Sequence, residues 1–267
     1  MQNQVVISSE SANNTWQSCV QHLSDNSMPF TAEFEQQALR VFTLSDFVAQ
    51  QCVRKPDLFI QLVQSQRFEQ CLTFQQMENL LLDKIKVIDT EQQLSTLLRQ
   101  FRNQQMIAIY WRDLLDIASV QETCAQVSTL ADICIEQANQ WLYEKLCREM
   151  GRPLNNQQPQ QLMVIGMGKL GGNELNVSSD IDLVFCYPKG GETENAGGSV
   201  KHEKFFNLLG RQLIKLLDQV TADGFVFRVD MRLRPYGDSG PLVMSFSAIE
   251  EYYQDQGRDW ERFAFIK

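Results

Sequence analysis

The distribution of glycine and proline divides the chain into two regions. From about Thr31 to Met150 both residues are scarce, and apolar residues recur at the three- and four-residue spacing of helices that bury one face. The stretch Arg152–Gln161, rich in Asn, Gln and Pro, is typical of a linker or domain joint, and short apolar runs follow it. The pattern predicts an α+β fold with a helical domain over residues 1–155 and a second domain over residues 156–267.

The first region contains clear helix patterns. One helix is expected to begin after Ser119, which with Glu122 has the spacing of a capping box, and to end at Gly151 and Pro153. The aromatic residues of these helices fit the apolar faces, so we interpret them as core rather than as a ligand site. The stripe that precedes Ser119 consists of Leu94, Leu97, Leu98, Phe101, Ile107, Tyr110, Trp111 and Leu114.

The second region predicts strands separated by a loop and a helix. Apolar strands are expected at Leu162–Ile165 and Ile181–Tyr187, and a strand of alternating character at Phe225–Leu233. Between the last two lie a glycine-rich loop, Pro188–Ser199, and a helix whose apolar face runs from Phe205 to Val220. This order of elements predicts a small domain that combines strands and helix.

Composition excludes several classes of protein. The formal net charge is -9 and the sequence pI is about 4.8, which argues against broad binding to nucleic acid and favours a protein or nucleotide partner. Acidity that only keeps the chain soluble is the alternative. No apolar run approaches the roughly 20 residues needed to cross a bilayer, and the first residues show no secretory signal. We therefore expect neither membrane association nor export.

Cysteine and histidine usage points to a carboxylate-based site. The seven cysteines are scattered and never spaced as CxxC, which predicts reduced, buried thiols in a cytoplasmic protein. There are only two histidines, His22 and His202, so the chain has little material for histidine-centred catalysis. His202, between Lys201 and Lys204 at an expected helix start, is predicted to be exposed to solvent.

A glycine motif follows the first predicted strand. Gly166-Met-Gly168-Lys169-Leu-Gly171 satisfies the GxGxxG pattern of dinucleotide-binding folds. Such a fold needs a full crossover helix before the next strand, and the strand at Ile181 begins too soon for one. We therefore do not expect a dinucleotide site. Lys169 either contacts a phosphate or caps the turn.

Two aspartates flank Ile181 at the start of the second strand. Residues two apart in a strand face the same side, so Asp180 and Asp182 are expected to project together with Cα atoms about 6.6 Å apart. Carboxylates placed in this way can share a pair of divalent cations, as nucleotidyl transfer requires. The glycines upstream let backbone N–H groups approach a phosphate. A solvated strand face is the alternative for an isolated pair of this kind.

The third predicted strand supplies another carboxylate. Asp230 stands between arginines on its mostly charged face, which suits a metal-binding carboxylate with phosphate-binding neighbours. A ladder of surface ion pairs is the alternative. The core face is expected to carry Phe225, Phe227, Val229 and Met231, and the charged face Val226, Arg228, Asp230, Arg232 and Arg234.

The carboxylates belong to a longer motif, Gly166-Met-Gly-Lys-Leu-Gly-Gly-Asn-Glu-Leu-Asn-Val-Ser-Ser-Asp-Ile-Asp182-Leu. This string resembles the signature of the glutamine synthetase adenylyltransferases, members of the DNA polymerase β-like nucleotidyltransferase superfamily. The resemblance spans most of the chain from about Leu94 and implies a nucleotidyltransferase domain with a small mixed sheet. It includes Leu98-Arg-Gln-Phe-Arg102, Trp111-Arg-Asp-Leu114, Phe227-Arg-Val-Asp-Met-Arg-Leu-Arg-Pro235, Gly237-Asp-Ser-Gly-Pro-Leu242, Glu251-Tyr-Tyr and Gly257-Arg-Asp-Trp-Glu-Arg262.

The resemblance also implies which residues form the site. The catalytic and metal-binding residues would be Asp180, Asp182 and Asp230, holding two Mg²⁺ or Mn²⁺ ions. Arg232 or Arg234 could hold an incoming phosphate, to judge from the face they share with Asp230. The other phosphate or nucleotide contacts would come from Gly171, Gly172, Ser178, Ser179 and Lys169.

The family carries two related nucleotidyltransferase domains, and the forms Asn176-Val-Ser-Ser179 and Gly237-Asp-Ser-Gly240 resemble the N-terminal copy. In the family, that copy removes AMP from a tyrosine of glutamine synthetase by phosphorolysis and releases ADP, whereas the other copy adds AMP from ATP. The implied partners are adenylylated glutamine synthetase and the PII signalling protein. Because the sequence stops at Lys267, we expect a truncated domain without the adenylylating site.

Two other functions fit parts of the sequence. One is a different polymerase β-like transferase, such as the uridylyltransferase that acts on PII or an antibiotic-modifying enzyme, and the long match after Asp230 disfavours it. The other is a non-catalytic module that docks glutamine synthetase or PII. Three aspartates of like charge disfavour this interpretation, because a binding module has no need of so costly a cluster.

Overall fold

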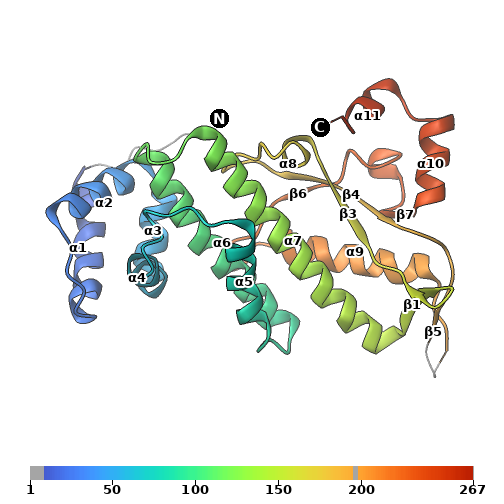
Figure 1. Ribbon diagram of the computed structural model, residues 1–267, viewed down its shortest axis with the longest axis horizontal. Helices are drawn as coiled ribbons and strands as arrows, with labels where there is room; N and C mark the ends of the chain where they lie inside the picture. The colour runs from blue at the N-terminus through green and yellow to red at the C-terminus, as the bar shows by residue number, and fades with distance from the viewer. Residues whose placement is uncertain (1–8, 195–197, 267) are drawn as a thin grey trace.

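The computed structural model describes residues 9–194 and 198–266, and helices make up most of its first part (Figure 1). The long helix patterns of the sequence are confirmed, because both Glu91–Leu114 and Val120–Met150 are continuous helices. The helices of this part are α1 (Ser9–Asp25), α2 (Ala32–Leu44), α3 (Asp46–Arg54), α4 (Pro56–Gln64), α5 (Phe74–Ile85), α6 (Glu91–Leu114) and α7 (Val120–Met150).

Local capping sets the limits of α7. The Ser119 hydroxyl accepts a hydrogen bond of 3.2 Å from the Glu122 N–H, as the capping pattern predicts. The Glu122 carboxylate, however, binds the Arg112 guanidinium at 2.6 Å instead of returning to the cap. Gly151 ends the helix with a φ of +83°, a conformation that glycine adopts without steric cost.

The described residues form two hydrophobic clusters, and α6 contributes to both. The first, here called the N-terminal core, lies among α1 to α4 and one face of α6. The second, the central core, joins α5, α7 and the opposite face of α6 to the sheet and to the helix after it. The N-terminal core includes Trp16, Leu23, Val41, Phe42, Phe59, Leu62, Phe68, Ile107 and Trp111. The central core includes Leu94, Leu98, Phe101, Leu130, Cys134, Leu142, Leu183, Phe185, Phe205, Leu209 and Leu213.

A small mixed sheet follows the helices, as Figure 1 shows on the side of the molecule away from α1 to α4. Its central strand, β4, pairs antiparallel with β3 and parallel with β6 and β7. The antiparallel β3–β4 pair confirms that the glycine motif does not open a dinucleotide-binding unit. The four strands are β3 (Met163–Met167), β4 (Ile181–Tyr187), β6 (Val229–Asp230) and β7 (Val243–Ser245).

Further elements surround this sheet. The helix α9 packs between α7 and the sheet. Two short helices follow the last strand. The polymerase β-like assignment and the domain limits 1–155 and 156–267 stay predictions. The remaining elements are α8 (Gly168–Gly171), α9 (His202–Asp218), a 3₁₀ turn (Gly237–Ser239), α10 (Phe246–Asp255) and α11 (Asp259–Phe263).

The stretch Arg152–Gln161 is not an irregular linker, and its interpretation as a domain joint stays a prediction. This stretch forms β1 (Arg152–Asn155) and β2 (Gln158–Pro159), an antiparallel hairpin whose β1 also pairs with β5 (Thr193–Glu194). Asn156 and Gln157 make the turn, both with positive φ. The glycine-rich loop predicted at 188–199 therefore contains a strand, and its residues 195–197 lie outside the described part of the chain.

The predicted strand Phe225–Leu233 is far shorter than expected. Only Val229 and Asp230 pair with β4, because β4 begins at Ile181 and offers no partner for earlier residues. The expected alternation fails as well, since Val226 and Phe227 are both buried.

The expected exposure of His202 is also wrong. Its side chain is fully buried at the start of α9, with its ring nitrogens 2.9 Å from the Lys189 carbonyl oxygen and 3.1 Å from the Glu192 carbonyl oxygen. The loop before α9 folds over the ring and places a backbone carbonyl oxygen opposite each ring nitrogen.

The seven cysteines are all free, as predicted, but not all are buried. Cys71 is exposed, and Cys124 and Cys147 are half-buried. Among residues 9–194 and 198–266, no helix has the length and apolar character needed to cross a membrane.

Candidate functional site

The structure brings two of the three predicted catalytic carboxylates into direct register. Asp182 of β4 lies opposite Asp230 of β6 in the parallel pair, and opposite Met167 of β3 on its other side. Two hydrogen-bonded neighbours in a sheet project toward the same face, so the two side chains share one edge of the site. Pairing of the two strands therefore places carboxylates that are far apart in the sequence side by side.

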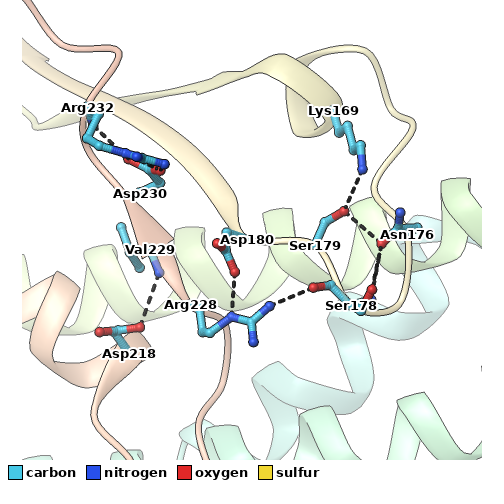
Figure 2. A network of polar contacts seen from close by, with 10 residues as sticks. All are labelled: Lys169, Asn176, Ser178, Ser179, Asp180, Asp218, Arg228, Val229, Asp230 and Arg232. Atoms are coloured by element: carbon cyan, nitrogen blue, oxygen red, sulfur yellow. Dashed lines mark hydrogen bonds and ion pairs between the residues drawn. The ribbon is translucent and has the colours of Figure 1, made fainter. Parts of the chain in front are cut away.

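Asp180 lies just before β4, and its carboxylate is held by an arginine. The Arg228 guanidinium binds the Asp180 carboxylate through Nε and donates a 2.7 Å hydrogen bond from Nη2 to the Ser178 carbonyl oxygen. Figure 2 shows Arg228 bridging these two residues. Asp180 therefore stands just outside the strand, which begins at Ile181 as the sequence predicts.

Asp230 is held by a second arginine. Arg232 folds back over it, as seen in Figure 2, and donates from its backbone N–H at 2.8 Å and from both Nε and Nη2. The hydrogen bonds from Arg232 lower the pKa of the Asp230 carboxyl, so this group stays ionised at neutral pH. The Val229 N–H donates to the Asp218 carboxylate at 3.2 Å, which fixes the short strand at its other side.

Asp182 has the opposite electrostatic environment. Burial, together with the negative charges of Asp230 and Asp180, raises the pKa of its carboxyl, while Arg232 and Lys169 act in the other direction. The negative charges of Asp230 and Asp180 therefore act on the Asp182 carboxyl. Among the described residues, Asp180 and Asp230 form ion pairs with arginines, whereas Asp182 does not.

The predicted phosphate-binding serines lie on a tight loop beside Asp180. The Asn176 side-chain oxygen accepts hydrogen bonds from the hydroxyls of Ser178 at 3.3 Å and Ser179 at 2.7 Å. Lys169 Nζ donates to the Ser179 hydroxyl at 3.2 Å, so α8 and the serine loop face each other (Figure 2). The structure thus places Lys169, Ser178 and Ser179 next to the carboxylates.

Two of the remaining predicted residues, Gly172 and Arg234, make hydrogen bonds within their own turns. The Gly172 N–H donates to the Gly168 carbonyl oxygen at 3.0 Å and is already used within the helical turn that contains Gly171. Arg234 donates to the Met231 carbonyl oxygen at 2.7 Å, and its side chain is 11% exposed. Its guanidinium is therefore held within its own turn, although its charge contributes to the lowered pKa of Asp230.

Sequence reasoning missed the roles of Gly168 and Arg228. Gly168 has a φ of +55°, and a Cβ atom built on it would lie 2.9 Å from Asp182 Oδ2. Its place as the second glycine of the motif was a usable signal for such a close approach. Arg228 is expected on the charged face, but no local pattern shows that it reaches across to Asp180.

Replacement of Gly168 by alanine is expected to disturb Asp182 directly. The new methyl group would press on the carboxylate, and the positive φ would add strain of roughly 1–2 kcal/mol. A displacement of this size at a reacting group is expected to lower kcat/KM by up to about 10²-fold. Gly190→Ala is the matched control, because a Cβ there meets no atom within 4 Å. Equal activity of the two variants would contradict a close fit of Gly168 to Asp182.

The arrangement of the carboxylate side chains shows whether they could bind a metal ion. Within the described ranges, no three His, Cys, Asp or Glu side chains are already arranged as metal ligands. Asp180 and Asp230 are turned toward Arg228 and Arg232, which accounts for this. The Asp182–Asp230 pair nevertheless offers the carboxylate oxygens that hard divalent cations prefer.

The fold and the site define an α+β protein with a cluster of carboxylates and arginines at the edge of a small mixed sheet. The chain belongs to the glutamate-ammonia ligase adenylyltransferase family, whose family model matches residues 35–267. This assignment confirms the resemblance of the sequence motif to that family.

Curated relatives agree with the family assignment. The chain is 51% identical over 230 residues to a bifunctional glutamine synthetase adenylyltransferase/adenylyl-removing enzyme of Pseudomonas aeruginosa, a match that covers 85% of this chain and 23% of the relative. It is 47% identical over 262 residues to the protein of the same description from Pseudomonas syringae pv. tomato, covering 96% of this chain and 27% of the relative. The chain thus spans about a quarter of the length of these relatives.

Proposed function

We propose that this chain carries an adenylyl-removing site, which transfers AMP from a tyrosine of adenylylated glutamine synthetase to inorganic phosphate and releases ADP. The observation that supports this most is the register of Asp182 with Asp230 on adjacent parallel strands, with Asp180 close enough to affect the same carboxyl. The names of the relatives support the substrate. The family resemblance supports PII as a regulatory partner and the cytoplasm as the place of action.

Asp182 and Asp230 would hold a Mg²⁺ or Mn²⁺ ion. The raised pKa of Asp182 supports this, because a cation beside it would offset the repulsion among neighbouring carboxylates. Asp180 would join in holding a second ion only when its carboxylate leaves Arg228. Such ions, when bound, neutralise phosphate oxygens and stabilise the attacking and leaving oxygens.

The proposed reaction exchanges one bond to phosphorus for another. An oxygen of inorganic phosphate bonds to the α-phosphorus as the bond from that phosphorus to the tyrosyl oxygen breaks. The bonding electrons leave with the tyrosyl oxygen, which takes up the proton carried by the incoming phosphate. The contribution of the chain is to bring two anions together, with positive charge from Lys169, Arg228 and Arg232.

Arg232 is the better of the two predicted arginines for the incoming phosphate. The Arg232 side chain is 74% exposed, so it can leave Asp230 and turn outward toward a ligand. The Arg234 side chain, in contrast, is held in its own turn. Arg232→Ala is expected to raise the KM for phosphate about tenfold through loss of a charge-assisted hydrogen bond. Arg234→Ala is expected to leave that KM unchanged. Initial rates of ADP release over a phosphate series measure both values, and an unchanged KM in Arg232→Ala would remove this role.

The proposed function is tested by following ADP release from AMP-modified glutamine synthetase in the presence of Mg²⁺ and phosphate. ADP is expected to appear only when phosphate is present, and to be absent with Asp180→Asn combined with Asp182→Asn. A full-length relative with the same changes at the matching positions is assayed in parallel, because the chain covers only a quarter of its length. Phosphate-independent release, or unchanged release by both double variants, would contradict the proposal.

A further inference from the structure

A pocket of about 400 Å³ lies directly beside the carboxylate cluster. Its walls come from four segments, namely α3, α6, the serine loop at Val177–Ser179 and the segment Thr221–Arg228. The volume lies within the range of pockets that bind small organic ligands. The pocket shares Ser178, Ser179 and Arg228 with the site described above, so the two are continuous.

Aromatic rings around a buried arginine form part of the wall of this pocket. The Arg102 guanidinium lies 5.3 Å from the ring centre of Phe47, 5.4 Å from that of Phe225 and 5.9 Å from that of Phe227. The Arg228 guanidinium lies 5.7 Å from the ring of Phe225 on the side toward Asp180. Flat, polarizable surfaces of this composition are suited to stacking with a planar aromatic group.

The buried arginine is not fully satisfied by the protein. Arg102 is 9% exposed and donates to the Asn103 side-chain oxygen at 3.1 Å. Its Nε has no hydrogen-bond partner, and the ion pairs found among the described residues do not include it. The Nε atom is itself buried, so what Arg102 offers to a ligand in the pocket is the positive charge of a guanidinium without an acidic partner in the described part of the chain.

The fixed position of the segment that carries Phe225 also favours a preformed site. Arg99 of α6 donates to the Gly224 carbonyl oxygen at 2.9 Å, and Asn103 Nδ2 donates to the Asp223 carbonyl oxygen at 3.0 Å. Lys55 adds an ion pair of 3.1 Å with Asp223. These contacts bind the segment before Phe225 to the helices, and a rigid aromatic wall costs less entropy on binding than a mobile one.

We propose that this pocket holds the planar base of the adenylyl group, stacked against Phe225 and the Arg102 guanidinium. The inference rests on the proposed function, which places the α-phosphorus at Asp182 and Asp230. The ribose then passes the Ser178–Ser179 loop, which lies between the pocket and the carboxylates. A larger pocket of about 690 Å³ among α4, α5 and α6 shares no residue with the site, so it cannot receive the base of a nucleotide bound there.

The test measures binding of two ligands to the complete chain by calorimetry. ADP carries the base, whereas pyrophosphate carries only the phosphates. Phe225→Leu removes one stacking surface, and Ala222→Trp fills the pocket from an exposed position at its rim. Both variants are expected to weaken ADP binding about tenfold or more and to leave pyrophosphate binding unchanged. Retained pyrophosphate binding also shows that each variant is folded at the site.

Phe246→Leu is the matched control, because Phe246 is an exposed phenylalanine on α10 outside the pocket. It is expected to bind ADP as the unaltered chain does. Equal ADP affinity in all three variants, an equal loss of ADP and pyrophosphate binding, or no ADP binding by the unaltered chain would each overturn the base site.

The same variants separate this inference from the proposed function. If Phe225→Leu and Ala222→Trp weaken ADP binding but the unaltered chain shows no phosphorolysis, the base site stands and the proposed reaction is wrong. If phosphorolysis occurs with unchanged kcat/KM and ADP affinity in both variants, the reaction stands and the base lies elsewhere.

Discussion

Replacing Asp182 with asparagine is expected to abolish ADP release while leaving the chain folded. Asparagine keeps the shape of the side chain but removes the charge that a divalent cation requires at the centre of the cluster. Loss of a central charged group in sites of this kind lowers kcat by about 10³-fold or more. The measurement is the rate of phosphate-dependent ADP release, with circular dichroism to confirm the fold.

The same substitution is expected to preserve or increase stability when no metal is present. The pKa of Asp182 is raised in the folded protein, so its ionised form is disfavoured there relative to the unfolded chain. Stability is therefore reduced as the pH rises from the ordinary pKa of the carboxyl through the raised one, and the full cost is present above the raised pKa. The Asp182→Asn variant would lack this charge and this pH dependence.

Asp116→Asn provides the matched control for this prediction. Asp116 forms an exposed ion pair of 2.9 Å with Arg40 in the helical part of the chain, and its φ of +58° is one that asparagine tolerates. It is expected to change neither ADP release nor, beyond about 1 kcal/mol, the free energy of unfolding. An active Asp182→Asn variant, or a loss of activity equal to that of Asp116→Asn, would show that Asp182 does not hold the reacting groups.

The parts of the fold that follow from local pattern could be predicted from the sequence. The strand Ile181–Tyr187 was placed correctly because its apolar run is bounded by Asp180 and by Pro188, and burial of both its faces needs such a run. The start and end of α7 followed from Ser119 and Gly151, which act within one turn of the helix. The three aspartates were found because their spacing is local to two short motifs.

The parts that failed depend on partners distant in the sequence. The alternation at Phe225–Leu233 is typical of a long strand, yet only Val229 and Asp230 pair with β4. The strand β4 begins at Ile181 and offers no partner before Val229, and its last residues pair with β7 instead. The burial of His202 depends on a loop that closes over it. The Arg228–Asp180 pair joins residues 48 apart, and no periodicity encodes such a contact.

The helices before the sheet belong to the candidate site as much as the sheet does. Arg99, Arg102 and Asn103 all lie on α6, and each contacts the segment 219–227 that forms one wall of the pocket. Farther along the same helix, Ile107 and Trp111 pack into the N-terminal core. Substitutions in that core are therefore expected to lower the free energy of unfolding before they affect the reaction at the carboxylates.

Trp111→Ala is expected to lower the free energy of unfolding by about 3–5 kcal/mol. The Trp111 side chain is completely buried, and its ring stacks on Phe68 with ring centres 4.1 Å apart and on Phe34 at 5.3 Å. Removal of the ring leaves a cavity that the surrounding aromatic residues cannot fill without leaving their own contacts. Thermal and denaturant unfolding, followed by circular dichroism, measure the effect as a lower midpoint.

Trp260→Ala is the control for this prediction, since Trp260 on α11 is 53% exposed and should cost no more than about 1 kcal/mol. Well below its transition, Trp111→Ala is expected to bind ADP as the unaltered chain does, because Arg99 and Asn103 keep their contacts with the pocket wall. Equal destabilisation by the two substitutions would contradict the central place of Trp111 in the N-terminal core. Loss of ADP binding by folded Trp111→Ala would instead mean that this core directly sets the shape of the pocket, through the helix that both share.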